Sequence, residues 1–503
     1  MSSLQTILDA PISWTKAAID PDVRSILEDL QANILKGHGR HHSVHIFFKF
    51  RDQSVEQASE IIRILGNVCT SAYEQLRANK RLPPFLDGGK ICCLFLSASG
   101  YKALGITDDQ PEPAFAEGMV KRGAALKDPP SATWDDRWRY GQPDAMFMIA
   151  DADQNKVRAE LELVKNWLQS QGVELLAIDE GLQQTRKFHA GAPEGVEHFG
   201  YVDGRSQPLF LQEDIDEEAT ATGGWDFRFK PSQFLVADPH GVNGFSAGSF
   251  FVYRKLEQNV RGFNKAEETL GRAIYNIPAS VTTFDETQQA NLDRAGAMVV
   301  GRFEDGTPLT MSQNAKGEVP VNNFDYMGDA SASRCPFHAH IRKVNPRGDI
   351  DRMPRSTVDP KDPVVNADDG RRPIMARRGI TYGALRPHNK DFTEFSDAGH
   401  EPEKDVGLIF MAYMASIVNQ FEFTQASWAN NPNFATKIFK QANEFSIPGT
   451  DPTIAQGDRA EEVYNWPDTD KKLGFANFVT LKGGEYLFAP SLSFLRGVGL
   501  TSH

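Results

Sequence analysis

The chain has 503 residues, of which 40% are hydrophobic and 24% are charged, an ordinary globular composition that gives no indication of disorder. Its formal net charge is −13, from 54 basic and 67 acidic side chains. This balance argues against nucleic acid or an anionic membrane as the main partner, because both favour a basic surface. At roughly 100–200 residues per domain, the length allows about two to four domains.

The start of the chain does not resemble a targeting signal. Residues 1–20 lack the basic region and the continuous apolar stretch of a signal peptide. The chain contains no apolar run of about 18 residues that could span a bilayer, and no Asn-x-Ser/Thr sequon. Its four cysteines include no CxxC pair, which argues against a disulfide framework or a structural zinc site. An intracellular protein is favoured, but secretion of a processed form stays open, so the compartment is undetermined.

The first half of the chain has the periodicity of an α+β unit. Apolar residues alternate along 44–50, as on one face of a strand. Apolar stripes at helical spacing follow over 55–69 and again over 157–168. Short apolar runs predict three further strands, at 91–97, 146–150 and 173–178. The predicted order is therefore βαββαβ, the ferredoxin-like unit.

The second half is predicted to repeat this unit. The acidic segment 213–218, followed by Gly223-Gly224, is the best candidate for a domain boundary and separates residues 1–215 from residues 225–503. Strands are predicted beyond it at 249–255, 297–303, 406–414 and 478–488. No sequence repeat is evident, so the duplication is inferred from the order of elements alone. The stretch 345–372, rich in Pro, Asp and Arg, is typical of an insertion or an irregular loop.

Three separated segments carry most of the chemical information. Cys335–Arg342 places two imidazoles two residues apart, in what we expect to be an extended segment, beside fixed cations. The other two are GYVDGRSQP at 200–208 and MARRGITYG at 375–383. Together they resemble the signature of the dye-decolourising peroxidases, haem enzymes that use hydrogen peroxide. The resemblance implies an α+β fold of two ferredoxin-like domains with antiparallel sheets, of the dimeric α+β barrel type, with haem b in the C-terminal domain. The length and the long insertions look most like the fungal members.

The resemblance makes His340 the proximal ligand of the haem iron. On a strand, His338 and His340 would project to the same side, so a two-histidine metal site and a swap of ligand between the two both stay open. An axial histidine needs an acceptor on its other ring nitrogen. The GxDPxxxQ-like segment 449–456 offers Asp451 for this role by resemblance, although an Asp-Pro pair is also ordinary turn chemistry.

The same resemblance assigns the distal side to Asp203 and Arg377. Peroxide must lose a proton from one oxygen and gain one on the other, and a carboxylate can carry that proton. A guanidinium supplies a permanent positive charge that stabilises the developing anion during O–O heterolysis. Arg205 departs from the family pattern, which has an apolar residue at this position. Because a carboxyl has a reference pKa of about 3.9 against about 6.5 for imidazole, a distal Asp predicts an acidic optimum.

Weaker matches suggest five further residues. Leu408 and Phe410 stand two apart on a predicted strand and therefore share a face. The resemblance places that face above the haem, where the two would narrow the peroxide pocket, and ordinary core packing is the alternative. Arg347 is a candidate for pairing with a haem propionate. Some members of the family pass the oxidising hole to surface aromatics, for which Tyr382 and Trp428 are the candidates here, although most such residues simply pack.

The sequence leaves the reductant open. With hydrogen peroxide as the oxidant, dyes, phenols, lignin fragments and manganese(II) are all compatible with the resemblance. Two other classes of protein are possible. A haem carrier or sensor with little turnover would use His340 but would need neither Asp203 nor Arg377. A non-haem iron or zinc enzyme would use His338, His340 and a carboxylate.

Overall fold

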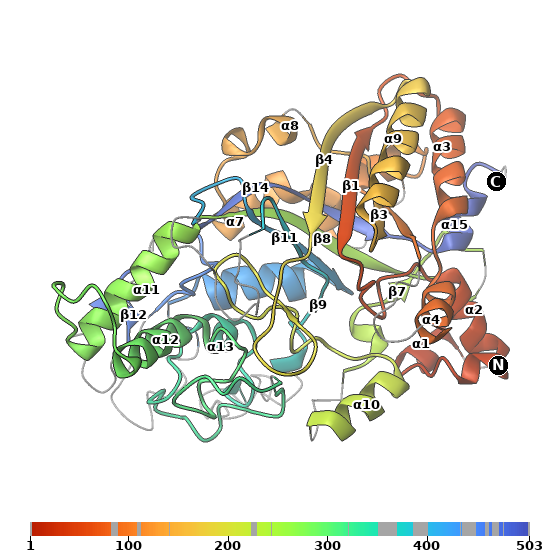
Figure 1. Cartoon of the computed structure of the whole chain (residues 1–503). Coiled ribbons are helices and arrows are strands. Elements are labelled where there is room, and N and C mark those ends of the chain that lie inside the picture. Colours follow the sequence, from red (N-terminus) through yellow and green to blue (C-terminus); the bar gives the residue numbers. More distant parts are fainter. Residues whose placement is uncertain are drawn as a thin grey trace, which may run out of the picture.

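Antiparallel strands and the helices packed on them account for most of the described chain (Figure 1). The computed structural model describes residues 3–81, 89–107, 112–139, 141–222, 229–242, 244–319, 321–350, 370–385, 401–432, 434, 449–457, 462–464, 472–475 and 477–500.

The N-terminal unit contains the predicted strands and helices, with small shifts at their ends. Its elements in chain order are β1 (His42–Lys49), α3 (Val55–Val68), β2 (Ile91–Leu96), β3 (Ala145–Asp151), α9 (Gln154–Ser170) and β4 (Glu174–Leu182). The strands are antiparallel in the order β2-β3-β1-β4, which is the ferredoxin-like arrangement. The capping box of Ser54 with Gln57 starts α3 by satisfying free N–H groups of its first turn. The predicted βαββαβ order is confirmed.

Shorter helices surround this unit. They are α1 (Leu4–Leu8), α2 (Pro21–Asp29), α4 (Ala72–Arg81), α5 (Ala98–Ala103), α6 (Pro113–Glu117), α7 (Met119–Leu126) and α8 (Asp136–Arg139).

The C-terminal unit repeats the same topology. Its elements are β8 (Ala247–Gln258), α11 (Val260–Tyr275), α12 (Glu286–Val300), β9 (Ala376–Arg377), β10 (Ile380–Tyr382), β11 (Gly407–Met414) and β14 (Val479–Ala489). The strands lie in the order β10-β11-β8-β14, again antiparallel, and β9 pairs with β11. The predicted strands at 249–255, 406–414 and 478–488 are therefore confirmed.

The predicted strand at 297–303 is wrong, because these residues include the end of helix α12. A capping box of Asp285 with Gln288 starts this helix, and Gly301 ends it in a left-handed conformation with φ of 99°. Its last turns are buried on every side, since Leu292 and all residues of 295–300 are buried. A short apolar run does not distinguish a buried strand from a buried helix.

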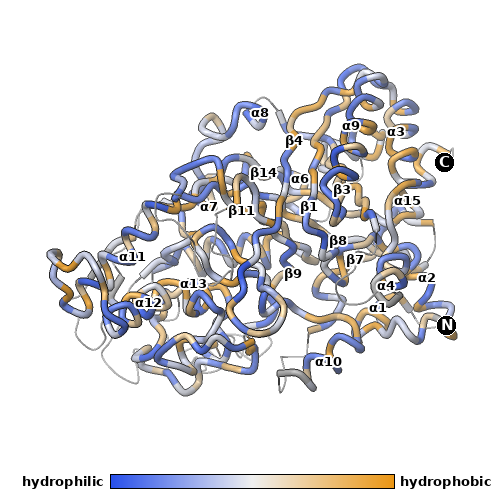
Figure 2. Tube along the Cα trace, in the orientation of Figure 1, coloured by the Kyte–Doolittle hydropathy of each residue, from blue (hydrophilic) through white to orange (hydrophobic). Residues whose placement is uncertain are grey.

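The two units join into one curved sheet. Strand β14 pairs with β2 through Phe488 and Leu96. At the opposite edges, β10 approaches β4, where the Thr381 hydroxyl donates to Leu182 O and accepts from Gln184 N at 2.9 Å. The apolar core extends across both units, and hydrophobic stretches recur along strands and helices in Figure 2. The fold is therefore the predicted dimeric α+β barrel type.

The acidic segment 213–218 forms part of helix α10 (Gln212–Thr222). The boundary between residues 215 and 225 stays a prediction. Of the predicted irregular stretch 345–372, residues 351–369 lie outside the described residues.

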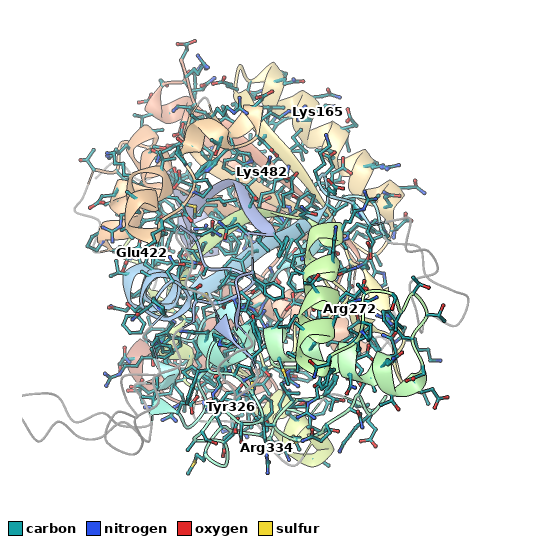
Figure 3. The ribbon with its side chains drawn as sticks, turned by 90° about the vertical axis from the view of Figure 1, so that its left-hand side faces the viewer. Lys165, Arg272, Tyr326, Arg334, Glu422 and Lys482 are labelled. Carbon is teal, nitrogen blue, oxygen red and sulfur yellow. The ribbon has the colours of Figure 1, made fainter. Side chains whose placement is uncertain are left out.

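Many charged side chains lie at the surface of the molecule, and many large aromatic side chains are buried in its interior. Figure 3 shows charged side chains such as Arg334 at the periphery, whereas Tyr326 is fully buried. Within the described ranges, no helix combines the length and the apolar character needed to cross a bilayer.

Candidate active site

The segment that carries His340 is folded by a buried arginine. Arg342 is fully buried and pairs with Asp329 at 3.0 Å and with Asp349 at 2.7 Å. It also donates to Cys335 O at 2.6 Å, while the Asp329 carboxylate accepts from Cys335 N at 2.9 Å. These contacts turn the chain before the short helix α13 (His340–Val344), so that His340 is the first residue of a helix.

The expectation that His338 and His340 lie on one face of a strand is therefore wrong. The His338 side chain is 1% exposed, and its ring meets the ring of Tyr464 edge-on at 4.6 Å between centroids. Gly449 packs so closely on this ring that a Cβ atom there would lie 2.7 Å from His338 Cβ. By contrast, the His340 side chain is 25% exposed. Burial and close packing thus favour His340 over His338 as a ligand to an added group.

Asp451 holds one ring nitrogen of His340. The distance between His340 Nδ1 and Asp451 Oδ2 is 2.8 Å, and the carboxylate is completely buried. Its Oδ1 accepts from Thr453 N at 2.8 Å, Thr453 Oγ1 at 2.9 Å and Ile454 N at 3.1 Å. The Asp-Pro pair therefore makes a turn and also contacts the histidine. Because an ionised carboxylate only accepts, Nδ1 carries the proton and Nε2 keeps its lone pair.

The charge state of Asp451 is consistent with this reading. Burial acts to raise the pKa of the Asp451 carboxyl, but the interaction with His340 and the hydrogen bonds to the carboxylate outweigh it, so this pKa lies below its ordinary value.

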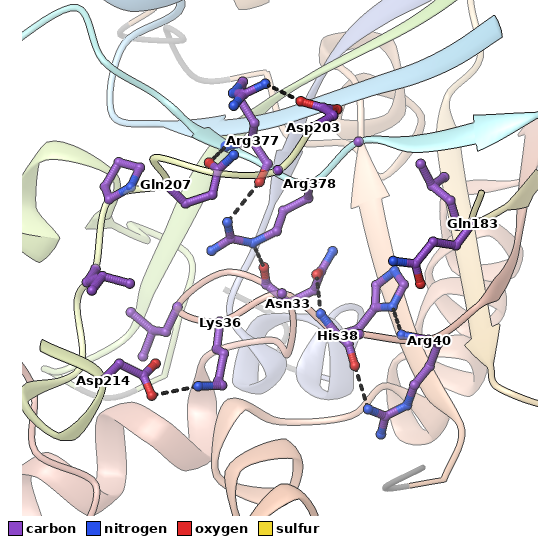
Figure 4. A pocket seen from close by; sticks show the side chains of 18 of the residues that line it. Asn33, Lys36, His38, Arg40, Gln183, Asp203, Gln207, Asp214, Arg377 and Arg378 are labelled. Atoms are coloured by element: carbon purple, nitrogen blue, oxygen red, sulfur yellow. Dashed lines mark hydrogen bonds and ion pairs between the residues drawn. The ribbon is translucent and has the colours of Figure 1, made fainter. Parts of the chain in front are cut away.

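A second pair, Asp203 and Arg377, lies on the sheet and its neighbouring loop. Arg377 Nη1 donates to Asp203 Oδ1 at 3.0 Å (Figure 4). Arg377 stands opposite Ala412 in the β9–β11 ladder, and opposite residues share a face of a sheet. Alternate residues of β11, Phe410 and Leu408, are on the same face as Ala412. The register therefore places Arg377, Phe410 and Leu408 on one side of the sheet.

The neighbouring Arg378 projects to the other face. Its guanidinium donates to three backbone carbonyls, Asn33 O at 2.9 Å, Ile34 O at 2.7 Å and Arg377 O at 2.9 Å. Arg378 therefore ties the loop 33–40 to the sheet, and only Arg377 of the two contacts Asp203 among the described interactions.

These side chains line a cavity of about 490 Å³. Asp203, Arg377, Leu408 and Phe410 line it together with residues of the loop 33–40. Because a water molecule occupies about 30 Å³ in the liquid, the cavity has room for molecules much larger than hydrogen peroxide.

Electrostatics keep Asp203 ionised. Burial acts to raise the pKa of its carboxyl, but the charge of Arg377, a hydrogen bond from Gly204 N–H and the charge of His340 outweigh burial, so this pKa lies below its ordinary value. Nearby Glu197 behaves oppositely, because burial raises the pKa of its carboxyl to about 7. Glu197 accepts from Phe199 N and Tyr201 N, at 2.8 and 3.0 Å, and so shapes the loop that carries Asp203.

Comparison with known proteins places the chain in one family. The model of the DyP dimeric alpha+beta barrel domain matches residues 29–182. "Multifunctional dye peroxidase DyP2" from Amycolatopsis is 37% identical over 98% of this chain and 99% of its own length. The chain belongs to the dye-decolourising (DyP-type) peroxidase family. It is therefore a haem peroxidase of the dye-decolourising type.

Two other relatives place the chain within the family. The crystal structure of the DyP-type peroxidase from Anabaena has a TM-score of 0.84 and 32% identity, and covers 99% of this chain and 100% of its own. "Dye-decolorizing peroxidase msp1" from Mycetinis scorodonius is 28% identical over 94% of this chain and 87% of its own length. The expected likeness to fungal members is therefore wrong, since the Amycolatopsis protein is more similar. Chain length does not separate the two groups, because the bacterial relative spans nearly the same length.

The residues of this peroxidase fit a haem group. His340 Nδ1 is engaged by Asp451, and no hydrogen bond found among the described residues uses Nε2, which leaves a lone pair for iron. Across the described part of the chain, no group of three or more His, Cys, Asp or Glu side chains could hold a metal ion. Because the chain belongs to a family of haem peroxidases, the alternative of a non-haem site at His338 and His340 is wrong. No manganese(II) site is located in the described ranges.

Arg302 is a site residue that the sequence alone did not reveal. Arg347 Nη2 and Arg302 Nη2 both donate to Ser206 Oγ, at 2.6 and 3.1 Å. Both guanidinium groups also lie over the ring of Phe324, at 4.2 and 4.9 Å from its centroid. Arg302 is 3% exposed, and burial lowers the pKa of its guanidinium to about 10. The two guanidinium groups therefore converge on one hydroxyl beside the distal loop. A lone Arg302 after an apolar run carries no such signal in the sequence.

The two aromatic candidates are not at the surface. Tyr382 is 8% exposed and Trp428 only 2%. Trp428 lies in a π-helical segment (Thr424–Ala429) and stacks on Phe434 at 5.1 Å between centroids. Lys255 Nζ lies 5.2 Å from the centre of the Tyr382 ring. The expectation of exposure is therefore wrong for both residues, and neither offers a bulky dye a direct contact surface.

Proposed function

We propose that this peroxidase binds haem b through His340 and reduces hydrogen peroxide while oxidising dyes, phenols or similar donors in one-electron steps. The observation that carries the proposal is the pairing of His340 with Asp451 and of Arg377 with Asp203, at 2.8 and 3.0 Å, in a chain of this family. When bound, the haem supplies the iron that accepts peroxide and stores the oxidising equivalents.

On the proximal side, His340 would hold the iron through Nε2. Asp451 orients the imidazole and makes it electron-rich, because its carboxylate accepts the Nδ1 proton. Arg347 is the proposed partner of a haem propionate, and Arg302 beside it is a second.

On the distal side, Asp203 would remove a proton from hydrogen peroxide and return it to the departing oxygen, which leaves as water. Its depressed pKa keeps the carboxylate ready to act as the base in mildly acidic solution. Arg377 would stabilise the negative charge that develops as the O–O bond breaks. Leu408 and Phe410, half-buried on the same face, would narrow the space above the iron.

The reductant is proposed by chemistry and by likeness. One solved relative, 25% identical, is a dye-decolorizing peroxidase in complex with 2,6-dimethoxyphenol, which supports phenols as donors to this chain. Bulky dyes would give their electrons through Tyr382 and Trp428 acting as buried relays. Manganese(II) stays a possible donor.

The test compares the wild type with His340→Ala, His338→Ala and Asp203→Asn after purification with added haem. We expect His340→Ala to lose iron coordination, read as loss of the normal Soret band, whereas His338→Ala keeps it. Asp203→Asn should keep the chromophore and lose most of its reactivity with peroxide. Normal coordination in His340→Ala together with loss in His338→Ala would contradict the proximal assignment.

The same experiment separates an enzyme from a haem carrier or sensor. An enzyme with Asp203 and Arg377 should react rapidly with peroxide and return to rest when a phenol is added. A carrier would mainly bleach, and Asp203→Asn would leave its response unchanged.

A further inference from the structure

Arg205 is the place where the distal motif departs from the family pattern, and its side chain is held by a carboxylate. Arg205 Nε donates to Glu194 Oε2 at 3.0 Å, and its Nη2 donates to Glu194 Oε1, so the ion pair is bidentate. The Arg205 and Glu194 side chains are 29% and 11% exposed. A two-pronged pair in this partly buried position fixes direction as well as distance.

Glu194 is itself anchored. It lies on β6 (Glu194–Gly195), which pairs with β5 (Thr185–Arg186). His189 Nε2 lies 3.0 Å from Glu194 Oε1, while His189 Nδ1 accepts from Gly191 N at 3.0 Å. Because Nδ1 accepts, Nε2 carries the proton and donates to Glu194. The carboxylate that holds Arg205 is thus held in turn by the hairpin and by His189.

The backbone of Arg205 reaches the distal pair. Arg377 Nη2 donates to Arg205 O at 3.2 Å, while Arg377 Nη1 donates to Asp203. Both neighbours of Arg205 have a positive φ, 82° at Gly204 and 62° at Ser206. A non-glycine residue such as Ser206 adopts this conformation only where its surroundings enforce it. The carbonyl of Arg205 therefore lies in a turn that is held by the anchored Arg205 side chain together with the contacts of Ser206 Oγ with Arg302 and Arg347.

We propose that Arg205, held by Glu194, is a positioning residue that keeps the guanidinium of Arg377 directed at Asp203. This inference rests on the proposed roles of Asp203 and Arg377. An apolar side chain at position 205 could pack but could not bind Glu194. Arg205 itself does not contact the reacting atoms in this proposal.

The test uses Glu194→Gln, Arg205→Leu and the double variant in the haem-loaded enzyme. Arg186→Leu is the matched control, because it removes the Arg186–Glu304 ion pair from the same hairpin without touching Arg377. Three quantities are measured: the rate constant with hydrogen peroxide as a function of pH, the equilibrium binding of cyanide, and the midpoint of thermal unfolding.

The pH dependence reports the orientation of Arg377. The titratable and charged groups that influence Asp203 are Arg377 on β9, Glu197 in its own loop and His340 on α13. Of these, Arg377 lowers the carboxyl pKa most. If Arg377 turns away, the pKa of Asp203 rises, and the acid limb of the rate profile moves to higher pH. A purely structural role would lower the unfolding temperature and leave this limb in place.

We expect Glu194→Gln and Arg205→Leu each to lower the peroxide rate constant by about ten- to a hundredfold. Each should also move the acid limb of the rate profile to higher pH and weaken cyanide binding. The double variant should resemble the single variants, because both remove one anchor. An unchanged limb and cyanide affinity in Glu194→Gln, which preserves shape, would overturn the inference even if Arg205→Leu folds poorly. Arg377→Ala distinguishes failure of the proposed function from failure of this inference. If Arg377→Ala leaves the peroxide reaction intact, the proposed function fails. If Arg377→Ala is impaired but Glu194→Gln and Arg205→Leu are not, only the positioning role of Arg205 fails.

Discussion

Replacement of Asp451 by Asn tests the proximal half of the site at a single atom. Asn has the same shape, and its side-chain oxygen could keep the contacts that Oδ1 makes with Thr453 and Ile454. The NH₂ group would then face His340 Nδ1, where Oδ2 now lies at 2.8 Å. The Asn NH₂ group and the Nδ1–H of His340 are both donors and cannot bind each other. The imidazole must therefore either turn or move its proton to Nε2, the nitrogen proposed to bind iron.

The size of the effect follows from the contact that is lost. A hydrogen bond to a charged group contributes about 1.5–3 kcal/mol, a factor of roughly 10 to 150 in affinity. Loss of such outer partners of a metal ligand typically costs about 10–100-fold. We therefore expect Asp451→Asn to weaken haem binding within this range. The reduction potential of the iron should rise, because a less electron-rich imidazole stabilises the oxidised metal less.

The assay is a titration of haem into the apoprotein, followed by the Soret band and by a redox titration of the loaded protein. Asp238→Asn is the control, because Asp238 is also a buried carboxylate, 6% exposed, that accepts from Ser491 N at 2.8 Å and Ser491 Oγ at 2.7 Å. This control should lower stability without changing the reduction potential. Unchanged haem affinity and potential in Asp451→Asn would refute the reasoning.

Three further predictions concern the distal side and the relays. Arg377→Lys keeps the charge but loses the planar fork, so kcat/KM for peroxide should fall by about tenfold or more, and wild-type kinetics would contradict the assignment. Because the pKa of the Asp203 carboxyl is depressed, its base form persists above that pKa and is lost only as pH falls through it. The peroxide rate should thus hold to a lower pH than a carboxyl with an ordinary pKa would allow, and Asp203→Asn should abolish the fall of the rate in acid. A rate maximum at neutral or alkaline pH would count against this role of Asp203. The double variant Tyr382→Phe/Trp428→Phe should lose oxidation of large dyes and retain that of small phenols, and survival of both activities would exclude the relay.

Local pattern predicted most of the fold. Alternation along 44–50 and helical stripes over 55–69 and 157–168 placed β1, α3 and α9, because burial of one face imposes these periods on any sequence. The same reasoning misplaced 297–303. An apolar run of that length is compatible with a strand or a helix, and only the packing of α12 against its neighbours decided between them.

The candidate site, like the fold, was predicted only in part. Motifs alone selected His340, Asp203 and Arg377, because the chemistry restricts these positions to few residue types. The secondary structure, burial and contacts of each residue could not be predicted from the sequence. Partners distant in the chain make His340 the start of a helix and bury Trp428.

By itself, the sequence of this protein determined the order of its elements, its family and the identity of its reactive side chains, since each depends on residue type and local spacing. The tertiary structure alone decided which faces those side chains occupy and what holds them. Arg205 and Glu194 become a pair, and Arg302 joins Arg347, only because separate segments meet in space. Contacts of this kind depend on packing between segments, for which single-residue patterns carry no signal.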